Sequence, residues 1–396
     1  MGSLGGVRRV QDAGVRGKTV LVRVDYNVPL RCGEITDDTR IRTSLPTISL
    51  LLERGAKAVL VTHLGRPDGK AVDDLRLDSV SSRLSELIER PVEKLDDCVG
   101  DEAANRIREG RAGDVFLLEN VRFHPGEEAN DPGFAAALAR PADVFVNDAF
   151  ATIHRAHAST LGVTDRLPSY AGLLVQRELE ALGRVLDEPA RPYLAIVGGK
   201  KASSKLGPLR DLVSRVDGIL VGGGVAFTFL RAMGFSVGDS AVDEGTLDDV
   251  VEIAHLAEER GVEIVLPIDA VLARELAPGV EATVGDARSI SSGWAGFDIG
   301  PETVRDFAQK IERAKTLVWT GPMGAFEVEP FSAGTKGVAE AVAASAAFSV
   351  IGGGETGDAI ARLGLAEQVS YISTGGGACL AVLQGKRLPA LEALRG

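Results

Sequence analysis

Short hydrophobic runs alternate with longer amphipathic segments along the whole chain. Runs such as 20–25, 58–63, 193–197 and 348–351 have the length of buried strands, and helical spacing of apolar residues follows between them. Strands that alternate with helices form parallel sheets covered by helices on both faces. The pattern therefore predicts an α/β fold.

The organisation of the chain changes near Leu167-Pro168-Ser169. Proline ends the preceding element there, and Ser169 is a candidate N-cap for an amphipathic helix over 171–186. With 396 residues, 45% of them hydrophobic, the chain can bury two cores. We predict two Rossmann-like parallel-sheet domains joined by a hinge helix, with short strands or loops over 271–300. The expected limits are 1–169 for the first domain, 170–187 for the hinge helix, 188–375 for the second domain and 376–396 for a C-terminal segment returning to the first domain.

Glycine-rich turns follow several strand-like runs of the second half. Gly198-Gly199 precedes a lysine cluster at Lys200, Lys201 and Lys205, and three further runs are followed by the triplets 222–224, 352–354 and 375–377. Glycine lets the backbone approach an anion closely, and helix N-termini favour negative charge. The set predicts a nucleotide-phosphate site; a solvated lysine loop and glycines needed only for close packing are the alternatives.

The common nucleotide signatures are absent. Gly17-Lys18-Thr19 resembles the end of a phosphate loop, but Asp12 stands where the first glycine should be, and the segment precedes a strand. No triplet completes a dinucleotide fingerprint with an acidic residue at the usual distance. Another class of nucleotide site is therefore expected.

The strand-like runs of the first half end in basic or polar residues instead of glycines. Arginine's rigid fork binds carboxylate and phosphate bidentately, so several at equivalent strand ends predict a pocket for a small anion of several charges. A surface position is the alternative for any single arginine. The candidates are Asp25, Asn27, Arg40, His63, Arg66, Arg122 and Arg155.

Charge and cysteine content limit the partners and the compartment. The formal net charge of −12 disfavours nucleic acid and anionic membranes as partners. Cys32, Cys98 and Cys379 show no metal-ligand spacing, as expected of reduced cytosolic thiols. His154 and His157 stand three residues apart, and structural or substrate-facing roles are favoured over zinc. The sequence shows no secretory signal and no membrane-spanning run, so a cytoplasmic protein is expected.

Two anion sites of different character, one in each domain, suggest transfer between two phosphorylated substrates. Phosphoryl transfer consists largely of positioning and charge neutralisation, which lysines, arginines, helix N-termini and Mg²⁺ supply without a nucleophilic side chain. The absence of a serine–histidine signature agrees with this interpretation.

The chain resembles the phosphoglycerate kinase family almost from end to end. In the first half the resemblance rests on the segments 22–29, 37–42, 63–67, 118–124, 146–150 and 154–159. In the second half it rests on the lysine segment and on 222–226, 298–301, 321–327, 352–356 and 373–378. So many ordered motifs exclude coincidence.

The resemblance implies reversible transfer of the γ-phosphoryl group of MgATP to the carboxylate of 3-phosphoglycerate, in a monomer that closes about its hinge helix. It assigns 3-phosphoglycerate to the seven strand-end candidates of the first half. It assigns catalysis to Arg40, Lys201, Gly353 and Gly376. It assigns the nucleotide to Gly199, Lys201, Lys205, Gly223, Gly224, Glu327, Gly352, Gly353, Gly354, Glu355 and Thr356, and Mg²⁺ to Glu355.

Several residues depart from the family pattern. Glu355 stands where an aspartate is usual, and Asp358 is the other candidate for Mg²⁺. Lys200 replaces an alanine, Ser204 an aspartate and Thr320 an asparagine. We expect these changes to tune nucleotide affinity and to leave catalysis intact. The alternatives are a catalytically weak nucleotide-binding or scaffold protein that retains the fold, and an enzyme acting on another phosphorylated carboxylic acid.

Overall fold

The computed structural model describes residues 6–395, which form two compact units. The first contains the described residues of Met1–Glu180 and Arg387–Gly396, and the second contains Ala181–Lys386. This division falls inside a helix and at 386/387, whereas the sequence suggested boundaries at 169, 187 and 375. Those domain limits stay a prediction. The predicted fold class, α/β with two parallel-sheet domains, is confirmed.

The first unit is built on a six-stranded parallel sheet in the order β5-β6-β4-β1-β7-β8. Its strands are β1 (Thr19–Arg23), β4 (Lys57–Val61), β5 (Val92–Lys94), β6 (Val115–Leu117), β7 (Val144–Asn147) and β8 (Ser169–Ala171). Its helices are α1 (Thr39–Glu53), α2 (Asp78–Ile88), α3 (Asp101–Glu109), α4 (Pro125–Glu128), α5 (Pro132–Ala139) and the C-terminal α14 (Pro389–Glu392). A short hairpin of β2 (Leu30–Arg31) and β3 (Glu34–Ile35) precedes α1.

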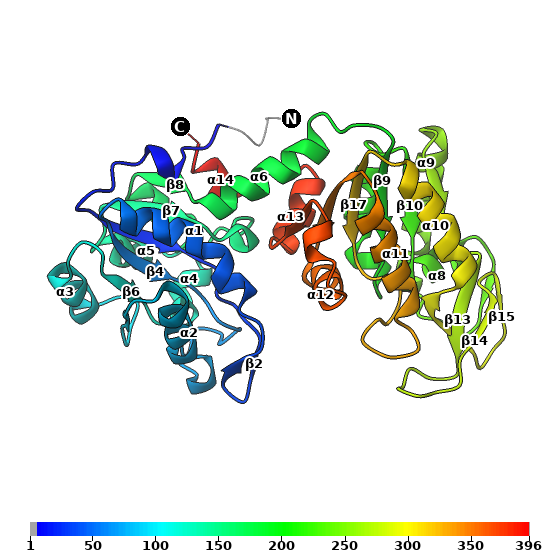
Figure 1. The fold of residues 1–396 in the computed structure, drawn as a ribbon, viewed down its shortest axis with the longest axis horizontal. Helices are drawn as coiled ribbons and strands as arrows, with labels where there is room; N and C mark the ends of the chain where they lie inside the picture. The colour runs from blue at the N-terminus through cyan, green and yellow to red at the C-terminus, as the bar shows by residue number, and fades with distance from the viewer. Residues whose placement is uncertain (1–5, 396) are drawn as a thin grey trace. The chain divides into compact units, whose positions relative to one another are not determined.

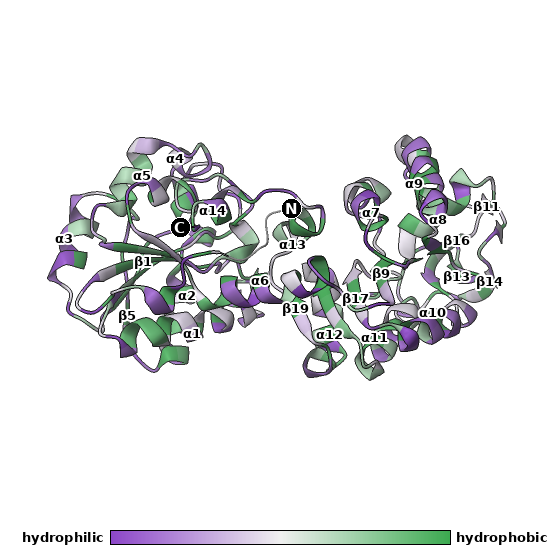
Figure 2. Cartoon of the chain, turned by 90° about the horizontal axis from the view of Figure 1, so that it is seen from above, coloured by the Kyte–Doolittle hydropathy of each residue, from purple (hydrophilic) through white to green (hydrophobic). Residues whose placement is uncertain are grey.

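The strands of this sheet are buried on both faces, as continuous apolar runs require. In β1, Val20 and Val22 pack into a core with α1 and α2, while Leu21 packs into a second core on the opposite face with α3 and α5. Figure 1 shows helices on both sides of the sheet, and Figure 2 shows hydrophobic colouring along β1. Burial on both faces holds the sheet in place. It therefore also fixes the positions of the strand ends, which carry the polar residues.

The second unit has a six-stranded parallel sheet in the order β12-β10-β9-β17-β18-β19. Its strands are β9 (Tyr193–Val197), β10 (Gly218–Val221), β12 (Glu263–Val265), β17 (Thr316–Thr320), β18 (Phe348–Gly352) and β19 (Tyr371–Ser373). Its helices are α7 (Leu206–Leu212), α8 (Gly223–Ala232), α9 (Leu247–Glu259), α10 (Pro301–Arg313), α11 (Ala333–Ala344), α12 (Gly354–Arg362) and α13 (Gly377–Leu383).

Short strands fill the irregular stretch of the second unit, as predicted. They are β13 (Asp269–Ala273), β14 (Thr283–Asp286) and β16 (Ala295–Ile299), which form an antiparallel sheet, and β15 (Ser289–Ile290). β15 pairs with β11 (Ser236–Val237), which precedes this stretch. Among the described residues, no helix has the length and apolar composition needed to cross a bilayer.

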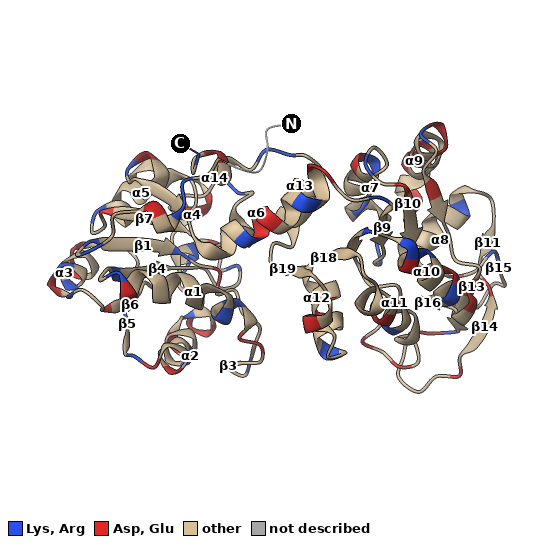
Figure 3. Ribbon diagram, turned by 45° about the horizontal axis from the view of Figure 1, so that its top comes forward, with Lys and Arg blue, Asp and Glu red and all other residues tan. Residues whose placement is uncertain are grey.

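Helix α6 (Leu173–Leu186) occupies the predicted position of the linking helix but begins differently from the expectation. Ser169 is not its N-cap, because it lies in β8 and its hydroxyl donates to the Leu167 carbonyl at 2.7 Å. The first amides of α6 donate instead to Thr47 Oγ1 and Asp148 Oδ1, each at 2.9 Å. Residues distant in sequence therefore cap the helix, on which Figure 3 shows charges of both signs.

Candidate active site

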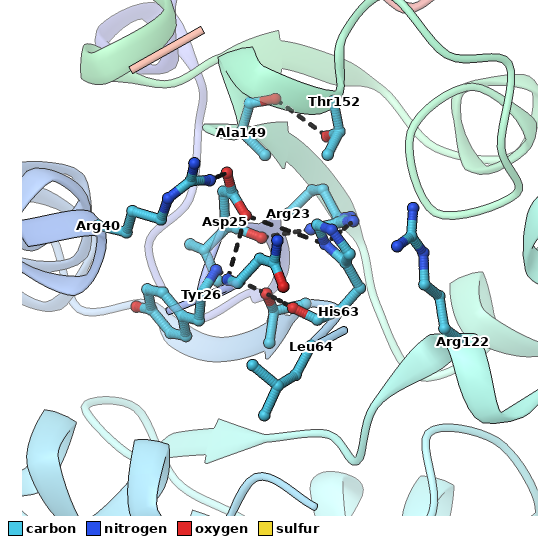
Figure 4. Close-up of polar contacts among 12 residues, drawn as sticks. Arg23, Asp25, Tyr26, Arg40, His63, Leu64, Arg122, Ala149 and Thr152 are labelled. Atoms are coloured by element: carbon cyan, nitrogen blue, oxygen red, sulfur yellow. Dashed lines mark hydrogen bonds and ion pairs between the residues drawn. The ribbon is translucent and has the colours of Figure 1, made fainter. Parts of the chain in front are cut away.

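The polar candidates of the first half lie at one edge of the first unit's sheet. Asp25 and Asn27 follow β1, His63 follows β4, and Arg122 lies in the 3₁₀ turn 121–123 after β6. Because parallel strands end at the same edge of a sheet, these side chains converge there. Figure 4 shows Arg40, which enters from α1, and Arg122 on opposite sides of this group.

Asp25 holds Arg40 at the strand ends. Its carboxylate forms an ion pair with the Arg40 guanidinium, and its other oxygen accepts the Asn27 amide at 3.2 Å. Asp25 is 7% exposed. The Asn27 side-chain oxygen in turn accepts the Gly65 amide at 2.8 Å, which ties the β1 and β4 loops together. Asp25 and Asn27 thus organise cationic and amide groups at the strand ends.

His63 is buried among positive charges. Its Nδ1 lies 3.2 Å from Nη2 of Arg23 and 3.9 Å from a carboxylate oxygen of Asp25 (Figure 4). Burial lowers the pKa of His63 well below its usual value, and Arg23, Arg122, Arg155 and Arg40 lower it further. The imidazole is therefore neutral at physiological pH.

Arg122, Arg155 and Arg66 bring further positive charge to the same edge. Arg122 is buried, donates to the Gly65 carbonyl at 2.7 Å and pairs with Glu128 at 3.1 Å. Burial lowers the pKa of Arg122, and Arg155 and Arg66 both add to the lowering. Arg155 is half-buried and Arg66 exposed. Mutual repulsion of these guanidinium groups makes the region a site for an anion.

The sequence interpretation missed a group of buried residues next to His63. Arg23 is 1% exposed, and Glu127 and Ser159 are fully buried. Hydrogen bonds connect Glu127 to Ser159, Ser159 to Arg23, and Arg23 to His63. Arg23 is the last residue of β1, so its position at a strand end could have identified it. Glu127 lies on α4 and follows no strand, so no such signal marked it. His157 lies 3.7 Å from Glu127, and burial, then arginines, lower its pKa to about 4. The His157 imidazole is therefore neutral at physiological pH.

In the second unit, the glycine turns of β9, β10 and β17 pack directly on one another. The Gly198 and Gly199 amides donate to the carbonyls of Thr320 and Pro322, at 2.9 and 2.8 Å. A Cβ on Gly224 would lie 2.2 Å from the Lys200 carbonyl oxygen, and one on Gly223 2.8 Å from that of Gly199. Close packing is thus one reason for these glycines, and it brings the strand ends together.

The turn after β18 is more open. Gly353 has φ +102°, and a Cβ there would make only ordinary contacts with the hydroxyls of Thr320 and Thr356. Thr356 is fully buried and accepts the Gly321 amide at 2.7 Å. Gly376, with φ +49°, precedes α13 and has open space where a Cβ would stand. Backbone at these two turns is accessible to a ligand.

The lysines of the cluster differ in exposure. Lys200 and Lys201 are exposed, whereas Lys205 is partly buried and donates to Thr320 Oγ1 at 3.0 Å. Burial lowers the pKa of Lys205, and Glu355 opposes the shift. Lys205, Thr320 and Glu355 therefore share one neighbourhood at the ends of β9, β17 and β18. Glu327 is exposed in the loop after β17.

Glu355 and a second group of residues were the candidates for holding a metal ion among the described residues. Glu355 is exposed in the first turn of α12. Asp97, Cys98 and His124 also bring ligand atoms within 4.8 Å of one another, although cysteine spacing had suggested no metal site. There His124 Nε2 already hydrogen-bonds Asp97 at 2.7 Å, and burial raises the pKa of the Cys98 thiol well above its usual value. We therefore assign no metal to that group.

Comparison with known proteins agrees with this geometry. The phosphoglycerate kinase family model matches residues 10–386. Phosphoglycerate kinases of Dictyoglomus turgidum and Moorella thermoacetica are 50% and 49% identical over 387 and 385 residues, covering 98% and 97% of this chain and 98% of each relative. The solved structure of phosphoglycerate kinase from Coxiella burnetii is 41% identical, covers 98% of both chains and has a TM-score of 0.87. The chain therefore belongs to the phosphoglycerate kinase family, whose members are phosphotransferases.

Proposed function

We propose that the strand ends of the first unit bind 3-phosphoglycerate, which receives a phosphoryl group reversibly from ATP. The observation that carries this proposal is the concentration of arginines around the neutral, buried His63, because an anion of several charges would offset the repulsion that remains among them. Arginine forks suit both the phosphate and the carboxylate of this acceptor. The proposed residues are Asp25, Asn27, Arg40, His63, Arg66, Arg122 and Arg155.

The strand ends of the second unit would bind the nucleotide. Glu327 would accept the ribose hydroxyls, the glycines after β9 and β10 would line the adenine pocket, and Lys205, Thr356 and the turn after β18 would receive the phosphates. The N-terminus of α12 favours these phosphates through its free amides. The proposed residues are Gly199, Lys201, Lys205, Gly223, Gly224, Glu327, Gly352, Gly353, Gly354, Glu355 and Thr356.

The reaction then requires charge stabilisation without a general base. A carboxylic acid with a pKa of about 4 is ionised at neutral pH, so the acceptor oxygen is already nucleophilic. Arg40 and Lys201, with backbone amides at Gly353 and Gly376, would neutralise the charge that spreads over the transferred group. Asp25 fixes Arg40 for this role through their ion pair.

Mg²⁺ fits this site through Glu355. The ion accepts one or two carboxylates and takes its other ligands from phosphates and water. Glu355 is exposed beside the turn that would hold the phosphates, and its carboxylate offers a hard oxygen ligand. Bound there, Mg²⁺ would neutralise phosphate charge; Asp358, one turn later, is the alternative ligand.

Acceptor and nucleotide are assigned to different units, so transfer requires the units to close on their ligands. Closure would also exclude water from the reacting groups. A monomeric, cytoplasmic enzyme is the form we propose, and its family membership supports this proposal. The scaffold alternative has no observation in its favour.

A coupled assay tests the proposal. The protein is mixed with Mg²⁺, ATP and 3-phosphoglycerate, and 1,3-bisphosphoglycerate is followed through its dehydrogenase-linked oxidation of NADH. We expect turnover that disappears when either Mg²⁺ or 3-phosphoglycerate is omitted. Binding of ATP without turnover would favour the scaffold alternative, and turnover with other phosphorylated carboxylic acids alone would contradict the acceptor assignment.

A further inference from the structure

A continuous series of buried contacts leads from Glu127 to the proposed acceptor site. Glu127 is fully buried, and its carboxylate accepts the Ser159 amide at 2.8 Å and the Ser159 hydroxyl at 2.6 Å. Nε of Arg23 donates to the same hydroxyl at 2.8 Å. Ser159 thus bridges a buried carboxylate and a buried guanidinium, and each of these charges offsets the cost of burying the other.

The donors and acceptors in this series have only one consistent order. A guanidinium only donates and a carboxylate only accepts, so the Ser159 hydroxyl accepts from Arg23 and donates to Glu127. The other end of Arg23 lies 3.2 Å from Nδ1 of His63 (Figure 4). Nδ1 must then be the acceptor, which places the proton of the neutral imidazole on Nε2.

We propose that Glu127 and Ser159 are positioning residues for the acceptor site: through Arg23 they hold His63 in the tautomer whose Nε2–H is a hydrogen-bond donor. The inference rests on the proposed binding of 3-phosphoglycerate at these strand ends. A neutral donor suits an oxygen-rich anion, because the wrong tautomer would present a lone pair to it and repel it. Neither Glu127 nor Ser159 needs to touch the substrate for this effect.

The variants Glu127→Gln and Ser159→Ala remove different parts of the series. The first removes the charge opposite Arg23 at nearly constant shape, and the second removes only the bridging hydroxyl. Glu119→Gln is the matched control, because Glu119 is a buried carboxylate of the same unit that pairs with Lys94 at 3.0 Å and accepts the Leu77 and Asn120 amides, and these partners are not members of the series. Circular dichroism establishes whether each variant is folded. If Glu127→Gln does not fold, Ser159→Ala alone provides the test.

Two measurements then decide the proposal. In protein labelled with ¹⁵N-histidine, the His63 ring resonances, assigned with His63→Gln, report which nitrogen carries the proton. In the coupled assay, we expect KM for 3-phosphoglycerate to rise about 10-fold or more in both variants, the loss typical of a hydrogen bond to a charged group. KM for ATP should change less than about twofold, because substitutions far from a binding site usually alter its binding free energy by no more than this.

Each result bears on the proposal. A shift of the His63 ring resonances together with the selective rise in KM supports it. Unchanged resonances in the folded variants, an unchanged KM for 3-phosphoglycerate, or an equal effect of Glu119→Gln would overturn it. Failure of the proposed function is distinguished by the variant His63→Gln. If 3-phosphoglycerate does not bind at these strand ends, this variant leaves KM for 3-phosphoglycerate unaltered, whatever the ring resonances of the other variants show.

Discussion

Lys205 donates a hydrogen bond to the hydroxyl of Thr320. This 3.0 Å contact joins the lysine cluster after β9 to the end of β17. Burial lowers the pKa of Lys205, so a polar partner supports its charged form. The threonine hydroxyl therefore supplies a hydrogen-bond acceptor to Lys205 at the end of β17.

Removing this hydroxyl should weaken nucleotide binding. Thr320→Val keeps the shape of the side chain, and we expect KM for ATP to rise about three- to tenfold, as for loss of one hydrogen bond to a charged group. Thr316→Val is the control, because Thr316 lies at the other end of β17 and donates to the Ala190 carbonyl at 2.7 Å. Equal KM changes in the two variants would show a general effect on the strand instead.

Truncation of Arg122 should weaken binding of 3-phosphoglycerate. We expect Arg122→Ala to raise KM for this substrate about 10- to 100-fold and to leave KM for ATP nearly unchanged, because one charge-assisted contact is lost in the first unit only. Arg106→Ala, which removes an exposed arginine paired with Glu93, is the control. The coupled assay measures both constants. A normal KM for 3-phosphoglycerate in Arg122→Ala would remove this residue from the site.

The sequence predicted the sheets and most strand-end residues because both depend on local patterns. Apolar runs identify buried strands, and parallel strands place the residues that follow them at one edge. Asp25, His63 and Arg122 could be located in this way. The predicted cap at Ser169 failed, since Thr47 and Asp148 cap α6 from other parts of the chain.

Residues that act through long-range burial had no such signal. Glu127 lies on the short helix α4, and its partner Ser159 follows 32 residues later. No periodicity identifies a buried carboxylate, because charged residues are normally exposed. The glycines after β10 illustrate a second limit, since a phosphate-binding turn and close packing against Lys200 demand the same residue.

Asp298 should make the stability of the protein depend on pH. Its carboxylate is buried on β16, and burial raises its pKa to about 7 from 3.8. The folded protein therefore keeps a proton that the unfolded chain releases between pH 3.8 and 7, so a rise in pH through this window lowers the free energy of unfolding. We expect a loss on the order of 2 kcal/mol between pH 5 and 8 from this group.

Urea unfolding at pH 5 and pH 8 isolates the contribution of Asp298. Asp298→Asn does not titrate, so the difference in stability between the two pH values should shrink by that amount relative to the unsubstituted protein. Asn at this position still accepts one of the two amides, of Gly334 and Ile299, that now donate to the carboxylate. The same pH dependence in both proteins would mean that Asp298 is ionised throughout.

Glu355 should determine the Mg²⁺ requirement. We expect Glu355→Gln to raise the Mg²⁺ concentration for half-maximal turnover at least severalfold, because an amide oxygen is a weaker ligand than a carboxylate. Glu355→Asp should keep activity, since it retains the charge. Asp358→Asn on the same helix is the matched control and tests the alternative ligand. If Asp358→Asn alone changes the Mg²⁺ titration, the metal belongs to Asp358.

Two neighbouring glycines at the start of α12 should respond differently to a methyl group. Gly353 has φ +102°, a conformation that side chains rarely adopt, whereas Gly354 has no positive φ and open space around its Cβ position. We expect Gly353→Ala to cost about 1–3 kcal/mol of stability or to rearrange the turn. Gly354→Ala should be neutral or stabilising by up to about 1 kcal/mol, because it restricts the unfolded chain.

Urea unfolding measures the stabilities of these two glycine variants, and the coupled assay measures their kcat. Because the Gly353 amide is proposed to contact the transferred group, kcat should fall only in Gly353→Ala; an equal fall in both variants would place the requirement on space at the helix start and not on the backbone conformation of Gly353.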